Sequence, residues 1–187
     1  MKSISFLLIL IGFINSASAD VLLVPAEYST IQSAIDAAIQ GDTVLVADGY
    51  YTGYGNTALD YAGKGIIVRS ENGPDSCIID CEGEGSAVHM DEGEPEGTEF
   101  SGFTILNAGD SGVQCRSSTA LISNCVIQNC SDDHHGGGID ASRPNTFIQI
   151  FNCKVLDNSA VNSGGGIRIA LDAMAEIAMC DIIGNSC

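Results

Sequence analysis

Four adjacent residues, Asp132, Asp133, His134 and His135, carry carboxylates and imidazoles that could do chemistry together. Such groups can bind a cation through carboxylate oxygens or transfer protons as general acids and bases. They lie directly before three consecutive glycines, so we expect them in a loop. The alternative is an ordinary solvated loop, because a one-off loop insertion need not be functional. Asp132 and Asp133 are therefore the candidate metal ligands.

A second group of acidic residues lies in the stretch from residue 80 to residue 99. Its members are Asp80, Glu82, Glu84, Asp91, Glu92, Glu94, Glu96 and Glu99. Carboxylates of this kind suit calcium, which is the one cofactor we consider here, since nothing in the sequence indicates an organic cofactor. The stretch lacks the D-x-D-x-D-G order of a tight calcium loop, and its Gly and Pro residues favour an exposed loop. We expect a solvated protrusion.

An internal repeat indicates which elements must position these residues. Gly-Gly-Gly-Ile occurs at 136–139 and again at 164–167, and the block that starts with Asn-Cys at 124 has counterparts at 152 and 179. The blocks resemble short strands between Gly and Asn corners. Repeats made only of strands predict a parallel β-helix, in which each turn buries its apolar face against its neighbours. Asparagines that recur after the second strand are expected to stack: Asn107, Asn129, Asn158 and Asn185.

One helix is expected ahead of the repeats. Ser29 to Gln32 fits a capping box with Ser29 as the N-cap, and apolar residues then recur with helical spacing as far as Ile39. Gly41 follows at the position of a C-terminal stop. An uncovered solenoid end would expose strand edges, so we predict that this helix caps the N-terminal end.

The strands that follow the glycine corners predict one polar outward face. Val88, Val113, Ile139 and Ile167 align as an inward column, so their successors should point outward. The predicted ligand-binding face consists of His89, Asp91, Gln114, Arg116, Asp140, Ser142 and Arg168. It would extend about 14 Å along the axis, enough for a few units of a linear polysaccharide. The alternative is a merely solvated face whose Asp140–Arg168 ion pair contributes about 0–1 kcal/mol.

The eight cysteines allow two interpretations. Cys125, Cys153 and Cys180 occupy equivalent positions of the repeat, so they should stack as a column. Neighbouring strands lie about 4.8 Å apart, whereas a disulfide prefers Cβ atoms about 3.8 Å apart. We favour buried free thiols for these three, with disulfides as the alternative. Cys77 and Cys81 are four residues apart, and the remaining cysteines have no evident mates.

The stretch 30–44 resembles the N-terminal cap of the pectate lyase-like superfamily, and 68–80 is similar to exported bacterial β-helix repeat proteins. The Gly-Gly-Gly-Ile and Asn-Ser pattern also resembles repeats of polymorphic outer-membrane proteins. This resemblance implies an all-β fold, a right-handed parallel β-helix solenoid with a short N-terminal capping α-helix. The superfamily includes lyases, hydrolases, esterases and adhesins, so the fold does not imply a function. The calcium-binding aspartates of its lyases and the aspartate set of its polygalacturonases are not recognisable here.

The N-terminus has the form of an export signal, with Lys2, an apolar run over 4–14 and Ala-Ser-Ala at 17–19. We expect a signal peptide over 1–19 and a β-helix domain over 20–187, secreted or at the cell surface. A net charge of −17 argues against nucleic acid as a partner. The sequence has no second long apolar run, so we expect no membrane span. The last repeat stops at Cys187 before its glycine corner, so we expect a domain truncated at its C-terminal end, where further rungs or a partner would cover the open turn.

These features favour an exported, non-catalytic module for adhesion or carbohydrate binding, with polysaccharide as its candidate partner. The alternative is a polysaccharide lyase or glycoside hydrolase, or a fragment of one, that acts on acidic polysaccharide. Its candidate catalytic residues would be Asp132, Asp133, Asp140 and Arg168.

Overall fold

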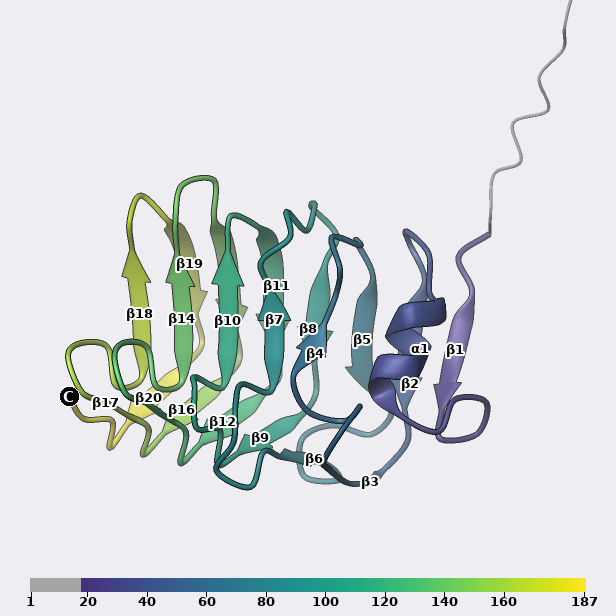
Figure 1. Ribbon diagram of the computed structural model, residues 1–187, viewed down its shortest axis with the longest axis horizontal. Helices are drawn as coiled ribbons and strands as arrows, with labels where there is room; N and C mark the ends of the chain where they lie inside the picture. The colour runs from purple at the N-terminus through teal and green to yellow at the C-terminus, as the bar shows by residue number, and fades with distance from the viewer. Residues whose placement is uncertain (1–17) are drawn as a thin grey trace, which may run out of the picture.

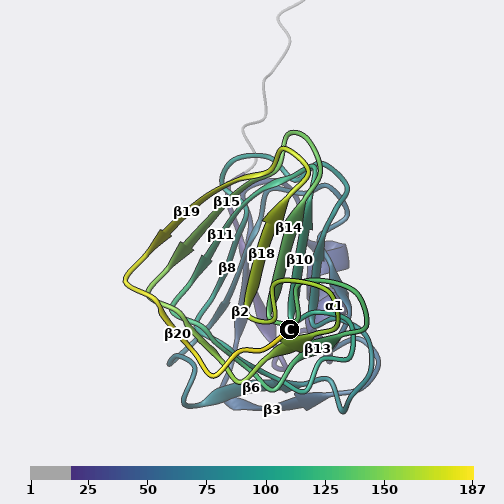
Figure 2. The same ribbon diagram turned by 90° about the vertical axis from the view of Figure 1, so that its left-hand side faces the viewer.

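The computed structural model describes residues 18–187, which form a solenoid of short parallel strands (Figure 1). Three sheets run along its length, and Figure 2 shows them enclosing the core when the solenoid is viewed from its C-terminal end. The prediction of an all-β parallel helix is confirmed. Residues 1–17 of the predicted signal peptide lie outside the described residues. Within the described part, no helix has the length and apolar character needed to cross a membrane.

Sheet 1 has seven strands: β1 (Val21–Val24), β2 (Thr43–Val46), β5 (Ile67–Ser70), β8 (Glu99–Ser101), β11 (Thr119–Ser123), β15 (Phe147–Phe151) and β19 (Met174–Ala178). Sheet 2 has five strands: β4 (Leu59–Asp60), β7 (Val88–Met90), β10 (Val113–Arg116), β14 (Ile139–Ser142) and β18 (Ile167–Ala170). Sheet 3 has six strands: β3 (Gly49–Thr52), β6 (Cys77–Asp80), β9 (Thr104–Leu106), β12 (Val126–Gln128), β16 (Lys154–Leu156) and β20 (Asp181–Ile183). A short pair, β13 (Ser131–Asp132) and β17 (Ser159–Ala160), adds a small fourth sheet.

The core is a set of apolar columns, because strand alternation turns every second side chain inward and parallel pairing keeps equivalent residues in register. Ile122 pairs with Ile150, and Ile150 pairs with Ile177. The rings of Phe100 and Phe103 stack with centroids 4.5 Å apart. In the last turn the inward residues are less covered, since Ile177 is 44% exposed whereas Ile150 is 1% exposed.

In the later turns two residues join sheet 1 to sheet 3, and the first of them has left-handed backbone. Asn124, Asn152 and Met179 have φ of 54°, 52° and 57° at this corner. Asparagine tolerates this conformation better than most residues. The two asparagines also stabilise each other along the axis, since Asn152 Nδ2 donates to Asn124 Oδ1 at 2.8 Å.

The predicted single column of asparagines is wrong, because the pairing of Gln128 with Leu156 sets Asn129 beside Asp157 rather than Asn158. Asn107 and Asn129 occupy a left-handed corner, with φ of 54° and 56°. Two other asparagines, one residue further along, form a ladder of their own. Buried Asn158 accepts a hydrogen bond from the Cys130 N–H at 2.8 Å, and its Nδ2 donates to Asn185 Oδ1 at 3.0 Å.

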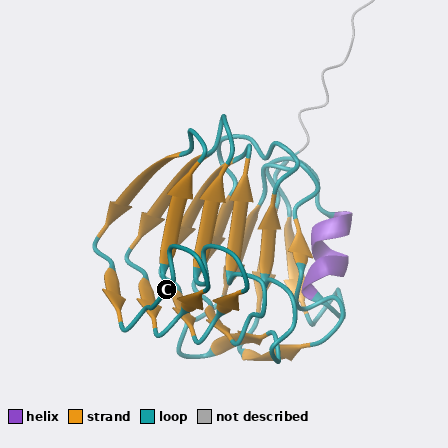
Figure 3. Ribbon diagram, turned by 60° about the vertical axis from the view of Figure 1, so that its left-hand side comes forward, coloured by secondary structure: helices purple, strands orange, loops and turns teal. Residues whose placement is uncertain are grey.

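The helix α1 (Ile31–Ala37) packs against β1, β2 and β4 at the N-terminal end of the solenoid, as Figure 3 shows. Its N-cap is Thr30, so the predicted cap at Ser29 is wrong by one residue. The capping box pairs Thr30 with Ser33, because Ser33 supplies both the N–H and the hydroxyl that complete it. Gln32 instead contacts the next turn, since its side chain accepts from the Asp60 N–H at 2.9 Å.

The corners that lead from sheet 2 to sheet 1 differ in length from turn to turn. Residues 91–98 join β7 to β8, whereas residues 117–118 alone join β10 to β11. Residues 143–146 join β14 to β15. The registers on both sides of these connections are nevertheless kept, because each strand still pairs with its equivalent in the next turn.

Candidate binding face

The strand register brings most of the predicted binding face together on sheet 2. His89, Gln114, Asp140 and Arg168 pair in succession across β7, β10, β14 and β18. Arg116 and Ser142 pair in the next outward position. Asp91 lies beyond the end of β7 and is not part of this ladder.

An ion-pair network lies at the centre of this face. Arg116 donates from Nε and Nη2 to Asp140 Oδ2 at 3.2 and 3.0 Å, and Arg168 Nη1 donates to Oδ1 at 2.9 Å. The Asp140 side chain is only 3% exposed, whereas those of Arg116 and Arg168 are 25% and 17% exposed. The alternative of a single solvated Asp140–Arg168 pair is therefore wrong, because the carboxylate is buried and shared by two arginines. The sequence reasoning missed Arg116 as a partner, although its place on the neighbouring rung could have indicated it.

The glycine corners explain why an outward residue such as Asp140 is buried. A Cβ added to Gly136 would lie 2.6 Å from the Asp140 Cβ, so only the bare backbone of that corner fits against this side chain. Gly164 lies against Arg168 in the same way, with a corresponding distance of 2.7 Å. Both glycines also have left-handed backbone, with φ of 75° and 71°. Each corner thus covers the base of the outward side chain that follows it.

Two other predicted members of the face have structural contacts. Gln114 is buried, and its Nε2 donates to the Asp110 carbonyl at 3.0 Å. Ser142 is buried as well, and its hydroxyl donates to Asp140 Oδ2 at 3.1 Å. The groups that the face offers to a ligand are therefore His89, Arg116 and Arg168, fewer than the sequence predicts.

The carboxylate of Asp132 is used to hold its own loop. It is buried, and Oδ1 accepts the backbone N–H groups of His134 and His135 at 2.5 and 2.6 Å. Oδ2 accepts the Ser111 hydroxyl at 3.0 Å. Burial raises the pKa of Asp132, but these hydrogen bonds to the ionised form outweigh it, so that the pKa is lowered.

The structure does not surround Asp132 and Asp133 with further metal ligands. Asp133 and His134 are exposed, whereas His135 Nδ1 lies 3.0 Å from the Ser163 hydroxyl on the next turn. Across residues 18–187, no three His, Cys, Asp or Glu side chains come close enough to hold a metal ion. A catalytic or calcium-binding role of Asp132 and Asp133 stays a prediction from the sequence.

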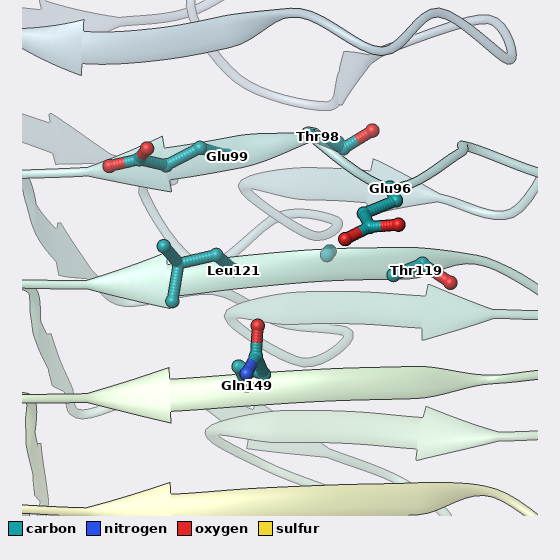
Figure 4. Close-up of a pocket in the computed structure, with 8 residues that line it drawn as sticks. Glu96, Thr98, Glu99, Thr119, Leu121 and Gln149 are labelled. Atoms are coloured by element: carbon teal, nitrogen blue, oxygen red, sulfur yellow. The ribbon is translucent and has the colours of Figure 1, made fainter.

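The loop 91–98 is attached to its neighbours, which corrects the expectation of a solvated protrusion. Glu94 is buried and accepts the Gly63 N–H at 3.0 Å and the Ser118 hydroxyl at 2.6 Å. Glu92 and Glu96 remain exposed. Glu96 borders a shallow groove of about 240 Å³ on the outer surface of sheet 1, together with Leu121 and Gln149 (Figure 4). That groove lies on a different sheet from the candidate face.

The cysteine column is present, and all eight thiols are free. The register of β12, β16 and β20 places Cys125, Cys153 and Cys180 at equivalent positions. The same column contains Cys77, since β6 pairs with β9 and β9 with β12, and Phe103 lies between it and Cys125. The sequence reasoning missed Cys77, although the Cys-Ile-Ile-Asp pattern at 77–80 matches the repeat. Burial raises its pKa to about 12.

The chain from residue 13 to residue 186 matches the family described as the right-handed β-helix region. A comparison with curated proteins and with solved structures finds no significant match. The chain belongs to the right-handed β-helix family, and the predicted resemblance to the pectate lyase-like superfamily is consistent with this result.

Proposed function

We propose that this β-helix protein is an exported module, secreted or at the cell surface, that binds a linear polysaccharide along the outer face of sheet 2 without catalysing a reaction. The observation that carries the proposal is the network of Arg116, Asp140 and Arg168. One buried carboxylate fixes two guanidinium groups that stay partly open to solvent. Binding groups that are held in place before the ligand arrives lose less entropy on binding.

The chemistry of these groups suits a polymer of sugars. A guanidinium carries five N–H donors in a fixed plane, and Asp140 uses only some of those on Arg116 and Arg168. The others can donate to sugar hydroxyl or carboxylate oxygens. The backbones of the two arginines lie two rungs apart, which is about 10 Å along the axis, and their guanidinium groups converge on the Asp140 carboxylate between them. A repeating ligand laid along the sheet could therefore contact both.

Binding is favoured over catalysis by the state of the carboxylates. Both oxygens of Asp140 accept hydrogen bonds from arginine. Of the Asp132 oxygens, Oδ1 accepts hydrogen bonds within its own loop and Oδ2 accepts one from Ser111 in an earlier part of the chain. Glycoside hydrolysis ordinarily needs two available carboxyl groups that flank the bond to be cleaved. Neither aspartate meets that need in this arrangement.

The test measures binding of a panel of neutral and acidic linear polysaccharides by affinity electrophoresis and calorimetry. Arg116→Gln and Arg168→Gln should each weaken binding about tenfold, because one charge-assisted hydrogen bond contributes about 1.5 kcal/mol. Arg69→Gln serves as the matched control, since Arg69 is exposed on sheet 1, and should bind as the parent does.

Two results would overturn the proposal. One is that no polysaccharide of the panel binds, or that the Arg69 variant loses affinity as the others do. The other is turnover: release of reducing ends or of unsaturated uronate, abolished in the Arg168 variant, would show a catalyst in place of a binding module.

A further inference from the structure

The thiols of successive turns come close together in the column of Cys125, Cys153 and Cys180. Their strands pair in register, so their backbones are stacked at the strand spacing. In each residue Sγ lies against the carbonyl oxygen two positions earlier, at 3.1, 3.4 and 3.2 Å respectively. The three side chains therefore have the same orientation, and neighbouring sulfurs are separated by about 4.8 Å.

That separation suits a soft cation with two ligands in a line. A metal–sulfur bond of about 2.3 Å, taken twice, nearly spans the strand spacing of about 4.8 Å. Thiolate ligands suit Cu(I), zinc and iron–sulfur clusters, and a site with only two ligands does not fit tetrahedral zinc. We propose that Cys125 and Cys153 form a linear two-sulfur site for Cu(I) between adjacent turns of the solenoid.

A surface groove borders this pair of the column. The groove has a volume of about 330 Å³, and it is lined by both cysteines together with Asn124, Asn152 and Lys154. The two cysteines belong to the apolar core beneath it, since each is about 1% exposed. Entry of a cation from the groove therefore requires local opening of this corner.

Loading of the pair exchanges two protons for one cation. On loading, Cys125 and Cys153 each lose their proton to solvent, and each thiolate forms one bond to Cu(I). The metal enters as Cu(I) and stays Cu(I), so no electron is transferred. The bound complex carries one negative charge.

Cys115 provides a matched control within the same protein. It is as buried as the pair, but its neighbours in the column on sheet 2 are Met90 and Ala141. Its sulfur therefore has no second thiol at the next rung. Cys180 provides a second control, because it belongs to the column but lies outside the proposed pair.

The test titrates the reduced 187-residue protein with Cu(I) under nitrogen, in competition with the chelator bathocuproine disulfonate. The parent should bind one equivalent with an ultraviolet thiolate-to-copper band. Cys125→Ser and Cys153→Ser should each bind about 100-fold more weakly, since a whole ligand is lost. Cys115→Ser and Cys180→Ser should bind as the parent does.

A measurement without substitutions keeps the proposal testable if a serine variant does not fold. At a urea concentration that exposes the buried thiols of the unloaded protein, bound Cu(I) should protect Cys125 and Cys153, and no other cysteine, from alkylation that is read by mass spectrometry. The proposal is overturned if the parent binds no stoichiometric Cu(I), if protection falls on other cysteines, or if folded Cys125→Ser retains full affinity. A disulfide between the two residues in the purified protein would overturn it as well.

Discussion

Substitution of Asp140 by asparagine perturbs the network at the centre of sheet 2. An amide has one oxygen, so it can accept from one arginine but must present N–H donors to the other. Breaking a fully buried ion pair costs about 3–5 kcal/mol. Arg116 and Arg168 are 25% and 17% exposed, so the released guanidinium can regain water. We therefore expect Asp140→Asn to lower the free energy of unfolding by about 2 kcal/mol.

Urea unfolding followed by circular dichroism measures this effect. With a slope of about 2 kcal/mol per molar urea, the midpoint should fall by about 1 M. Asp75→Asn is the control, because Asp75 is exposed and its substitution makes the same change in net charge. A double variant with Arg168→Gln should lose less than the sum of the two single losses, since the residues share one interaction. The reasoning is refuted if Asp140→Asn unfolds within about 0.5 kcal/mol of the Asp75 variant.

Three further substitutions or treatments test other parts of the structure. Gly137→Ala should lower the free energy of unfolding by at least about 3 kcal/mol, because the added Cβ would lie 2.1 Å from the Ser159 carbonyl oxygen; a urea midpoint close to that of the parent would contradict this packing. The pKa of Asp132 is lowered in the folded state, so its stabilisation is present above the unfolded value of about 3.9 and is lost as the pH falls through the folded pKa. Asp132→Asn should accordingly be less stable than the parent at pH 7 but unfold with a weaker dependence on acid, and parallel acid-unfolding curves would argue against it. Iodoacetamide at pH 8 should label exposed Cys187 well before Cys115, whose pKa is raised to about 12 by burial, and equal labelling in the folded protein would show that the core is open.

Much of the fold could be predicted because its signal is periodic. The alignment of Val88, Val113, Ile139 and Ile167 is the register that the strands adopt. Each of these residues is apolar for the same reason, since it faces the interior of the stack, so the repeat reports the same constraint several times. A single unrepeated element gives a weaker signal. This explains why the N-cap was predicted one residue too early, at Ser29, whereas it is Thr30 in the structure.

The errors arose where residue type and register disagree. Asn129 and Asn158 are the same residue type but do not stack in the same column. Asn129 has left-handed backbone at a corner, whereas Asn158 is buried and accepts a hydrogen bond from the Cys130 N–H. Period-two alternation places Asp140 outward correctly, but it cannot show that the corner at Gly136 covers it. Burial of an outward residue depends on how a loop folds back, and that is a property of the three-dimensional structure.

The candidate face was predicted as a set of residues but not as a network. Alternation along each strand put Arg116 and Arg168 on the same side of sheet 2, and the structure confirms that placement through the pairing of neighbouring strands. Their shared use of Asp140 depends on side-chain reach across three rungs, which the spacing in the sequence does not specify.

The unequal corners beside sheet 2 bear on how such a protein can change over evolution. The connection at 91–98 is much longer than the one at 117–118, yet the strands that follow both of them keep the register of the stack. Insertions and deletions at this side therefore alter the rim of the outer face while the core columns stay as they are. The solenoid separates the part of the chain that maintains its architecture from the part that can acquire a new ligand.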